Sequence, residues 1–584
     1  MSRIYISIFL LSTLIALPTV IRASCDCSST DPINPCLGNS ITVLVNASSI
    51  NGSSSTDAIF EWKFNSGGEA ASCGKFANGD YWIAPGPGKS SVEITNISSL
   101  GAGKISADAD PVLEKIGLLD GSNKYGNYIA SENIVPILPL TYTTTTSLVA
   151  AIQRDESKEG VCGTSRIVGE CVDAYNVVTV LPSIPARCGV DMLRPNISGD
   201  SKQMLHLSDF DFSLLPSLSY LSGTDPVGLE RIRERWAHSI EIFGLVSASG
   251  KFFSEGGRAF RSHILVDDYA GGTASQWYNE MMVLLSDDNS LSEKMPAISS
   301  ILTYGLDLYH AMYNTTQSRY FGVGATQHAG KFMPVVLFAS LLKDPSFADK
   351  LKEVRNHVRD NHFSGPHELA QIQVGPNGPV WGDTLSYGPV QQHGSYWGNV
   401  LASRCYDNAP VGTTCNPTLG KKTQKDPYGY IDGPPNKPGT SYMISTLGTQ
   451  RSFVAMMWLI PKIREVVNYE EIIKYIDRVD TQGIQVLNDP CVTPDSREDP
   501  TQCDPYRNTG CKYYGVTWGP VDPTDENSTC ITIETPPYTK AGRFTSLQGT
   551  MVKPSYTSSQ VEKNWSKIKA QSILGVPRNF HLFQ

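Results

Sequence analysis

Short hydrophobic runs of the kind found in β-strands recur between about residues 25 and 200, in a stretch rich in serine, threonine and glycine. The clearest predicted strands lie at residues 41–45, 58–62, 91–94 and 177–181. Clusters of glycine and proline, such as residues 84–88, separate them. Many short strands divided by turn signals are typical of a β-sandwich and not of alternating strands and helices. We therefore expect a β-sandwich domain at residues 24–205.

The hydrophobic spacing changes near Pro226, where apolar residues begin to recur every three or four positions. The first stripe consists of Leu229, Ile232, Trp236, Ile240 and Phe243. Further helices are predicted at residues 273–287, 293–313, 327–343, 346–359, 394–404, 442–466, 469–484 and 560–573. Amphipathic helices of this length pack as antiparallel hairpins in a bundle or an α/α toroid, and the spacing does not separate these two arrangements. The helical domain is expected at residues 206–485.

The first 23 residues have the pattern of a secretory signal peptide. A basic start at Arg3 is followed by an apolar run and then by Ala23, a small residue suited to cleavage. Pro18 interrupts the apolar run, which argues against the alternative of an uncleaved membrane anchor. A lipoprotein signal ending at Cys25 is a second alternative. We expect a secreted, extracellular product without a membrane span in the mature chain.

Glycosylation and cysteine patterns agree with this compartment. Seven Asn-x-Ser/Thr acceptors are present, at Asn46, Asn51, Asn96, Asn196, Asn314, Asn527 and Asn564. The 13 cysteines lie mostly in the two flanks and lack paired CxxC spacing, so we expect disulfides rather than zinc ligands. The odd count leaves one thiol free or in an intermolecular bridge. Residues 486–584 are expected to form a disulfide-containing C-terminal segment.

The net charge of −9 argues against nucleic acid as a partner, because nucleic-acid binding needs a basic surface. Neither the GxSxG elbow of serine hydrolases nor a GxxxxGK[ST] phosphate loop occurs in the sequence. No cofactor is expected. The fold class predicted from these patterns is α+β multidomain, with the sandwich first, a toroid-like helical domain second and the cysteine-containing segment last.

Four ordered segments resemble large secreted proteins of polysaccharide-degrading bacteria, a group of unsettled activity. The segments lie at residues 74–83, at 192–202, at 304–339 and from 378 through 396–402 to 475–478. This resemblance implies a β-sandwich joined to an α/α toroid, an arrangement that polysaccharide lyases also use. The relatives carry Gly-Arg-Lys before a proline where this chain has Gly330-Lys331-Phe332, so one cation replaces two.

A polysaccharide lyase needs a cation for the uronate, a base for the C5 proton and an acid for the leaving oxygen, roles that Tyr and His can fill. The expected catalytic residues are His328, Lys331, Tyr309, His393 and Tyr387. The glycine-rich approach to His328 lets a ligand come close to the backbone. Its structural alternative is a helix start at which His328 caps or packs. The expected substrate-binding residues are Trp381, Trp397 and Arg319.

Other chemistries remain open at this stage. A zinc site would draw on the histidines with Glu368 or Asp383, although no HExxH spacing supports it and no metal is expected. Glycoside hydrolysis would need two facing carboxylates, chosen among Asp307, Glu280, Glu368 and Asp383. The first expectation is therefore a secreted, polysaccharide-cleaving glycoprotein, by elimination more than by hydrolysis. The alternative is a non-catalytic extracellular glycoprotein, structural or glycan-binding, with a capacity for self-assembly.

Overall fold

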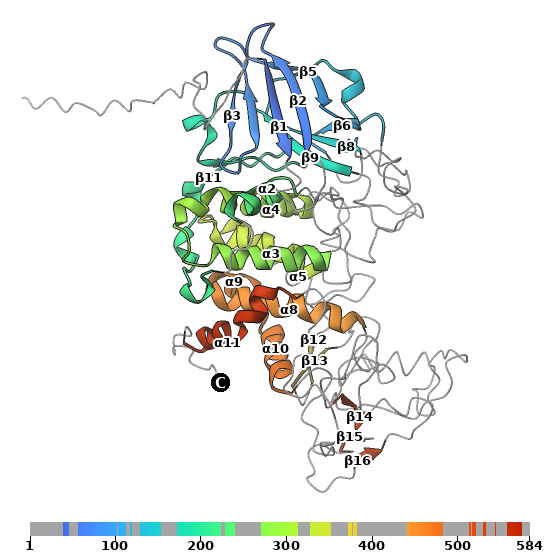
Figure 1. Cartoon of the computed structure of the whole chain (residues 1–584), viewed down its shortest axis with the longest axis vertical. Coiled ribbons are helices and arrows are strands. Elements are labelled where there is room, and N and C mark those ends of the chain that lie inside the picture. Colours follow the sequence, from blue (N-terminus) through green and yellow to red (C-terminus); the bar gives the residue numbers. More distant parts are fainter. Residues whose placement is uncertain are drawn as a thin grey trace, which may run out of the picture.

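The protein is described here by a computed structural model. The described residues are 39–45, 57–101, 103–111, 117–118, 129–153, 172–223, 228–239, 270–313, 327–351, 372–375, 378–381, 441–482, 513–514, 517–520, 530–532, 543–544 and 557–574. In this part of the chain two β-sheets are followed by layers of helices, so the fold is α+β, as the sequence predicts (Figure 1).

The N-terminal part is built from a four-stranded and a five-stranded sheet. The first has the order β1 (Ser40–Val45), β2 (Ala58–Asn65), β5 (Val92–Ser99) and β7 (Leu140–Tyr142). The second has the order β3 (Ser72–Lys75), β4 (Tyr81–Ala84), β9 (Val172–Val180), β8 (Thr146–Gln153) and β6 (Lys104–Ala109). All pairings within these two sheets are antiparallel except β4 with β9, which run parallel from the Tyr81–Val178 pair onward.

Four of these strands, β1, β2, β5 and β9, overlap with strands predicted from the sequence, where every second side chain points to the same face. In β2, Phe60, Trp62 and Phe64 are buried between neighbours that are partly or fully exposed. Their side chains and those from the second sheet, such as Val178, share one core. Trp62 Nε1 donates a hydrogen bond of 3.0 Å to Asn176 Oδ1 on β9, which ties the two sheets together. The result is a β-sandwich.

The helices lie in successive layers below the sandwich (Figure 1). They are α2 (Leu229–Ala237), α3 (Ala270–Leu284), α4 (Leu291–Tyr313), α5 (Gln327–Leu341), α8 (Ser441–Leu459), α9 (Pro461–Val467), α10 (Glu470–Gln482) and α11 (Ser559–Leu574). The described residues also include the short 3-10 segments η1 (Val135–Ile137), η3 (Ala186–Gly189), η4 (Leu207–Asp209), η5 (Phe212–Leu214) and η6 (Ser219–Leu221). Short strand pairs complete the description: β10 (Met192–Leu193) with β11 (Leu205–His206), β12 (Ile372–Gly375) with β13 (Gly378–Trp381), β14 (Tyr513–Tyr514) with β17 (Arg543–Phe544), and β15 (Thr517–Pro520) with β16 (Cys530–Thr532).

One hydrophobic core runs through all the helical layers. It begins at Leu193, before the predicted domain boundary at 205/206, and includes Trp565 of α11 from the predicted C-terminal segment. Helices α4 and α5 pack closely because Gly305 of α4 has no side chain. A Cβ at this position would lie 2.5 Å from the Pro334 carbonyl oxygen. Because Trp565 belongs to this core, α11 is part of the helical body.

The helix predicted at residues 442–466 is broken in the structure. Helix α8 ends at Leu459 and Ile460 takes an extended conformation, after which Pro461 occupies the first turn of α9. Proline has no N–H to continue a helix and disfavours helical geometry in the residue before it, so the break is local in origin.

The helices predicted at 273–287, 293–313, 327–343, 469–484 and 560–573 are present, with shifts of at most three residues at their ends. The stripe that starts at Leu229 is shorter than expected, because α2 ends at Ala237, and Ile240 and Phe243 lie outside the described residues. The helix predicted at 346–359 is described only as far as residue 351. The residues predicted as a helix at 394–404 lie outside the described part. Among the described residues, no helix has the length and apolar character needed to cross a membrane.

A buried arginine joins the sandwich to the helices. Arg194 follows β10 and is 1% exposed. Its Nε donates to Asp80 Oδ2 of the sandwich at 2.6 Å. Its two terminal nitrogens donate to the two oxygens of Asp307 in α4, at 2.9 and 2.6 Å. Burial alone would lower the pKa of Arg194, but the two carboxylates outweigh it and raise that pKa above its ordinary value. One cation thus pairs with a carboxylate from the sandwich and a carboxylate from the helices.

A second cation whose side chain is buried, Lys202, lies in the segment that connects the sandwich to the helices. Lys202 Nζ contacts Asp110 at 2.6 Å and also donates to the carbonyl oxygens of Asn196 and Ile197. Nearby, the backbone N–H of Gly117 donates to Asp108 Oδ2 at 2.6 Å. Burial raises the pKa of the Asp108 carboxyl to about 7; the Gly117 bond opposes this shift and the charge of Glu132 adds to it.

Replacement of the joining arginine should destabilise the whole chain. Arg194→Met keeps the side-chain bulk but leaves Asp80 and Asp307 buried without a counter-ion. Breaking a buried ion pair in this way costs about 3–5 kcal/mol. We expect a loss of that size in the free energy of unfolding, measured by urea denaturation.

The matched control is Arg187→Met, since Arg187 pairs with Asp191 but its side chain is 72% exposed. Exposed pairs contribute at most about 1 kcal/mol, so this variant should stay within that range of the wild type. Equal losses for the two variants would contradict the joining role of Arg194.

The Asp108 carboxyl should make stability depend on pH. Its folded-state pKa, about 7, lies above that of the unfolded chain, about 3.9, so folding favours the protonated form. The contribution of the Asp108 carboxyl to the free energy of unfolding is therefore largest below about pH 4 and is lost as the pH rises from about 4 to 7. Asp108→Asn should flatten this decline in melting temperature, whereas Glu69→Gln, at an exposed carboxylate of the same sandwich, should leave it in place. An unchanged slope in Asp108→Asn would refute this assignment.

Candidate functional site

A tight turn between β3 and β4 forms the sandwich side of the candidate site. Phe76 N donates to the Asp80 carbonyl and Gly79 N donates to the Phe76 carbonyl, each at 2.9 Å. Asn78 Nδ2 donates to Asp80 Oδ2 at 2.7 Å. Gly79 has a φ of +95°, which non-glycine residues rarely adopt. The turn therefore presents the Asn78 carbonyl oxygen and the Asp80 carboxylate toward the helices.

Helix α2 forms the other side. Glu230, Arg233 and Glu234 recur at intervals of three and four residues, which places them on one side of a helix, and His238 follows Glu234 by four. Ile232 is buried in the helical core. The sequence of α2 thus divides into a core-facing side and a charged side.

Arg233 attaches this charged side to the turn. Its Nη1 donates to the Asn78 carbonyl oxygen at 3.0 Å, and its other nitrogens bond both oxygens of Glu230 and one oxygen of Glu234. Burial opposes the charge of Arg233, but the bonds to Glu230 and the two carboxylate charges hold its pKa above the usual value. Ser300 of α4 donates to the same Asn78 carbonyl oxygen at 3.4 Å.

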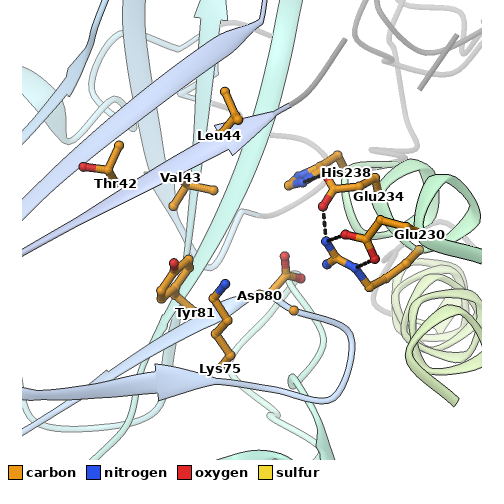
Figure 2. Close-up of a pocket in the computed structure, with 11 residues that line it drawn as sticks. Thr42, Val43, Leu44, Lys75, Asp80, Tyr81, Glu230, Glu234 and His238 are labelled. Carbon is orange, nitrogen blue, oxygen red and sulfur yellow. Dashed lines mark hydrogen bonds and ion pairs between the residues drawn. The ribbon is translucent and has the colours of Figure 1, made fainter. Parts of the chain in front are cut away.

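A pocket of about 360 Å³ with a mixed polar and apolar lining lies between these two sides. Its lining residues come from β1, from the turn with its flanking strands, and from α2: Thr42, Val43, Leu44, Lys75, Gly79, Asp80, Tyr81, Glu230, Arg233, Glu234 and His238. Figure 2 shows Lys75 and Tyr81 on the sandwich side, facing Glu234 and His238 at the end of α2. The volume is near the lower end of the range for small-molecule sites, about 300–1,000 Å³.

The chemistry of the pocket centres on a carboxylate and an imidazole. Glu234 Oε2 lies 3.4 Å from His238 Nε2. Burial would raise the pKa of Glu234, but His238, Arg233 and Lys75 together lower it, so this carboxylate is charged at neutral pH. The His238 residue is 5% exposed, and its Nδ1 is buried without a hydrogen-bond partner among the described residues. Lys75 Nζ lies 4.7 Å from the centre of the Tyr81 ring.

These groups can hold a polar ligand by hydrogen bonds. A buried nitrogen without a partner costs free energy unless a water molecule or ligand satisfies it. The Glu234 carboxylate accepts hydrogen bonds, and the Tyr81 ring adds apolar surface. Within the described part of the chain, no group of three His, Cys, Asp or Glu side chains has the arrangement of a metal site.

Among the predicted catalytic residues, only Tyr309 has a described side chain, and it does not line this pocket. Tyr309 is 5% exposed and packs among the rings of His310, Phe338 and Phe347 in the helical core, which does not fit contact with a polymer. His328 and Lys331 lie in the first turns of α5, but their side chains fall outside the described part.

The other predicted site residues have side chains that the structure does not describe. His393, Tyr387, Trp397 and Arg319 lie outside the described residues, as does the side chain of Trp381 at the end of β13. Two of the carboxylates considered for hydrolysis serve structural ion pairs instead. Asp307 binds Arg194, and Glu280 binds Arg235 and accepts from Trp236 Nε1. The other two, Glu368 and Asp383, lie outside the described residues.

The structure separates the glycan acceptors that it describes. Asn96 is exposed on β5. Asn196 is fully buried, and its Nδ2 donates to the carbonyl oxygens of Ser198 and Ser201. Asn564 is 3% exposed, and its Nδ2 donates to the Gln560 carbonyl oxygen. Because a glycan is bulky and attaches at Nδ2, Asn196 and Asn564 do not fit the predicted role in the folded chain. The acceptors Asn46, Asn51, Asn314 and Asn527 lie outside the described residues.

Sequence reasoning missed Glu234 and His238 as site residues. Their four-residue spacing on the side opposite Ile232 is visible in the sequence and would have indicated a neighbouring acid–imidazole pair away from the helical core. Lys75 and Tyr81 lie in the 74–83 segment but carried no predicted role. Only the contact between the sandwich turn and α2 identifies the four side chains as one site.

The chain matches no protein-family model, no curated protein and no solved structure.

The packing of the sandwich turn against Arg233 should depend on Gly79. A methyl group at Gly79 would overlap the Arg233 guanidinium, in addition to the strain of a side chain at φ +95°. Gly79→Ala should therefore cost about 1–2 kcal/mol for the backbone and about 1–3 kcal/mol more for the overlap, measured as the free energy of unfolding.

Gly68→Ala is the matched control. Gly68 also has a positive φ, +78°, but a Cβ there would meet no atom within 4 Å. Only the backbone cost should appear in this variant. Equal destabilisation of the two variants would show that Arg233 does not pack on the turn as described.

Proposed function

We propose that this chain is a secreted carbohydrate-active glycoprotein, and that it binds a sugar unit of an extracellular polysaccharide in the pocket between the sandwich and α2. The signal-peptide pattern and the exposed acceptor at Asn96 support the secretory route. Cys73 is disulfide-bonded, which is typical of proteins from oxidising compartments. The order of a sandwich and then layered helices supports the toroid-like arrangement that the sequence resemblance implies.

One observation carries the binding proposal: His238 Nδ1 is buried without a partner beside the charged Glu234, in a pocket that both bodies build. Sugars carry many hydroxyl groups, which both donate and accept hydrogen bonds. Different hydroxyls of one sugar can therefore satisfy the imidazole nitrogen and the carboxylate oxygen. The adjacent Tyr81 ring suits the apolar face of a sugar.

Cleavage of the polymer, the first expectation from the sequence, is a separate candidate. The observation in its favour is that His328 and Lys331 lie three residues apart at the start of α5, a spacing that places both on one side of a helix. Hydrolysis through Asp307 and Glu280 is not supported, because arginines already hold both carboxylates. The non-catalytic role, with or without self-assembly, agrees with binding alone.

Binding to a panel of extracellular polysaccharides tests the proposal. His238→Ala removes the nitrogen that we assign to the ligand and should weaken affinity roughly tenfold, the value of about one buried hydrogen bond. Isothermal titration calorimetry with soluble oligosaccharides measures this change. His206→Ala, on β11 and outside the pocket, should retain wild-type affinity.

Two activity readouts accompany the binding measurement. Ultraviolet absorbance of an unsaturated product reports elimination, and new reducing ends report any cleavage. A signal that persists in His238→Ala and disappears in His328→Ala would favour the α5 candidate. Absence of binding and of both signals across the whole panel would reject a carbohydrate function.

A further inference from the structure

We propose that the pocket selects uncharged, hydroxyl-rich sugar units over uronates and sulfated sugars. This inference rests on the proposed glycan binding and adds the chemical class of the ligand. It follows from how the charges that line the pocket are already paired.

The cations of the pocket are engaged by groups of the protein. Arg233 directs its nitrogens at Glu230, Glu234 and a backbone carbonyl oxygen. Lys75 lies over the Tyr81 ring, and its charge acts on Glu234. Arg194, behind the turn, is held by two carboxylates. A ligand carboxylate or sulfate would have to compete with these groups for a positive partner.

The carboxylates of the pocket oppose an anion directly. Three acidic side chains line it, Asp80, Glu230 and Glu234, against two cations, Lys75 and Arg233. The pKa of Glu234 is lowered, chiefly by His238 against the opposing effect of burial, so its negative charge is present at neutral pH. Like charges at short range repel more strongly in a partly buried site than in water.

The groups left for a ligand are those that hydroxyls satisfy. His238 Nδ1 has no hydrogen-bond partner in the described part of the chain, and Glu234 Oε2 has only the 3.4 Å contact to His238 Nε2. One sugar hydroxyl can donate to the carboxylate, and another can donate to or accept from the imidazole Nδ1. A neutral sugar therefore satisfies both groups without adding negative charge. Figure 2 shows the His238 ring on the pocket side of α2, next to Glu234.

Carboxyl-reduced polymers provide a matched test. Each uronate oligosaccharide is compared with its carboxyl-reduced form, which has the same linkages and length but carries CH₂OH in place of the carboxylate. Calorimetry with the wild-type chain should show tighter binding of the reduced form by roughly tenfold. A higher salt concentration screens charge repulsion and should therefore reduce the difference in affinity between the reduced form and the uronate form.

Variants then assign the preference to the pocket. Glu234→Gln removes a negative charge and a strong acceptor, so it should weaken binding of the reduced form and narrow its advantage over the uronate. Glu465→Gln is the matched control, since Glu465 is also ion-paired on a short helix but lies in another layer of the fold (Figure 1). It should leave both affinities unchanged, and melting curves check that each variant is folded.

The outcomes separate this inference from the proposed function. Tighter binding of the uronate form by the wild-type chain would overturn the preference while leaving glycan binding intact. A neutral preference that Glu234→Gln does not alter would place the site elsewhere and overturn the inference. Binding of neither form in any pair would overturn the proposed function together with the inference. The wild-type comparison needs no variant and decides the preference even if Glu234→Gln fails to fold.

Discussion

The buried Arg194 is the interaction on which the arrangement of the two bodies depends. It bonds Asp80 at the end of the sandwich turn and both oxygens of Asp307 in α4. In a low-dielectric interior each of these charges is tolerated only while its partners are in place, so the three groups restrict one another. This restriction orients the turn against the helices. The Asn78 carbonyl oxygen then reaches Arg233, and Gly79 lies against the guanidinium of the same residue.

The candidate site is a consequence of this joint. Lys75 and Tyr81 belong to the sandwich, whereas Glu234 and His238 belong to α2 and its end, and neither body alone forms the pocket. Within it most charges pair with each other, and the His238 Nδ1 atom is left without a partner in the described part of the chain. Because the cations of this site are already engaged by other groups of the protein, the site favours ligands with hydroxyl groups over anionic ligands.

The local elements were largely predictable from the sequence. Strands β1, β2 and β9 and helices α3, α4 and α5 follow the alternating and helical periods. Partners across long separations were not predictable. Asp307 suited a catalytic carboxylate until the structure showed its bonds to Arg194, 113 residues away. Asn196 fitted the glycan-acceptor pattern, but its side-chain amide donates hydrogen bonds to the carbonyl oxygens of Ser198 and Ser201. A sequence pattern records residue types and spacing, and these do not reveal whether a polar group will be exposed or buried with a partner.

The sequence by itself determined the α+β order and the place of several strands and most of the described helices, because periodicity acts over a few neighbouring residues. The break before Pro461 has the same local origin, although the hydrophobic spacing predicted one continuous helix there. The tertiary structure alone decided which charges pair, that α11 joins the helical core, and where the pocket lies. These features depend on contacts between residues far apart in the chain, and burial makes each contact strong or costly according to the partner it finds.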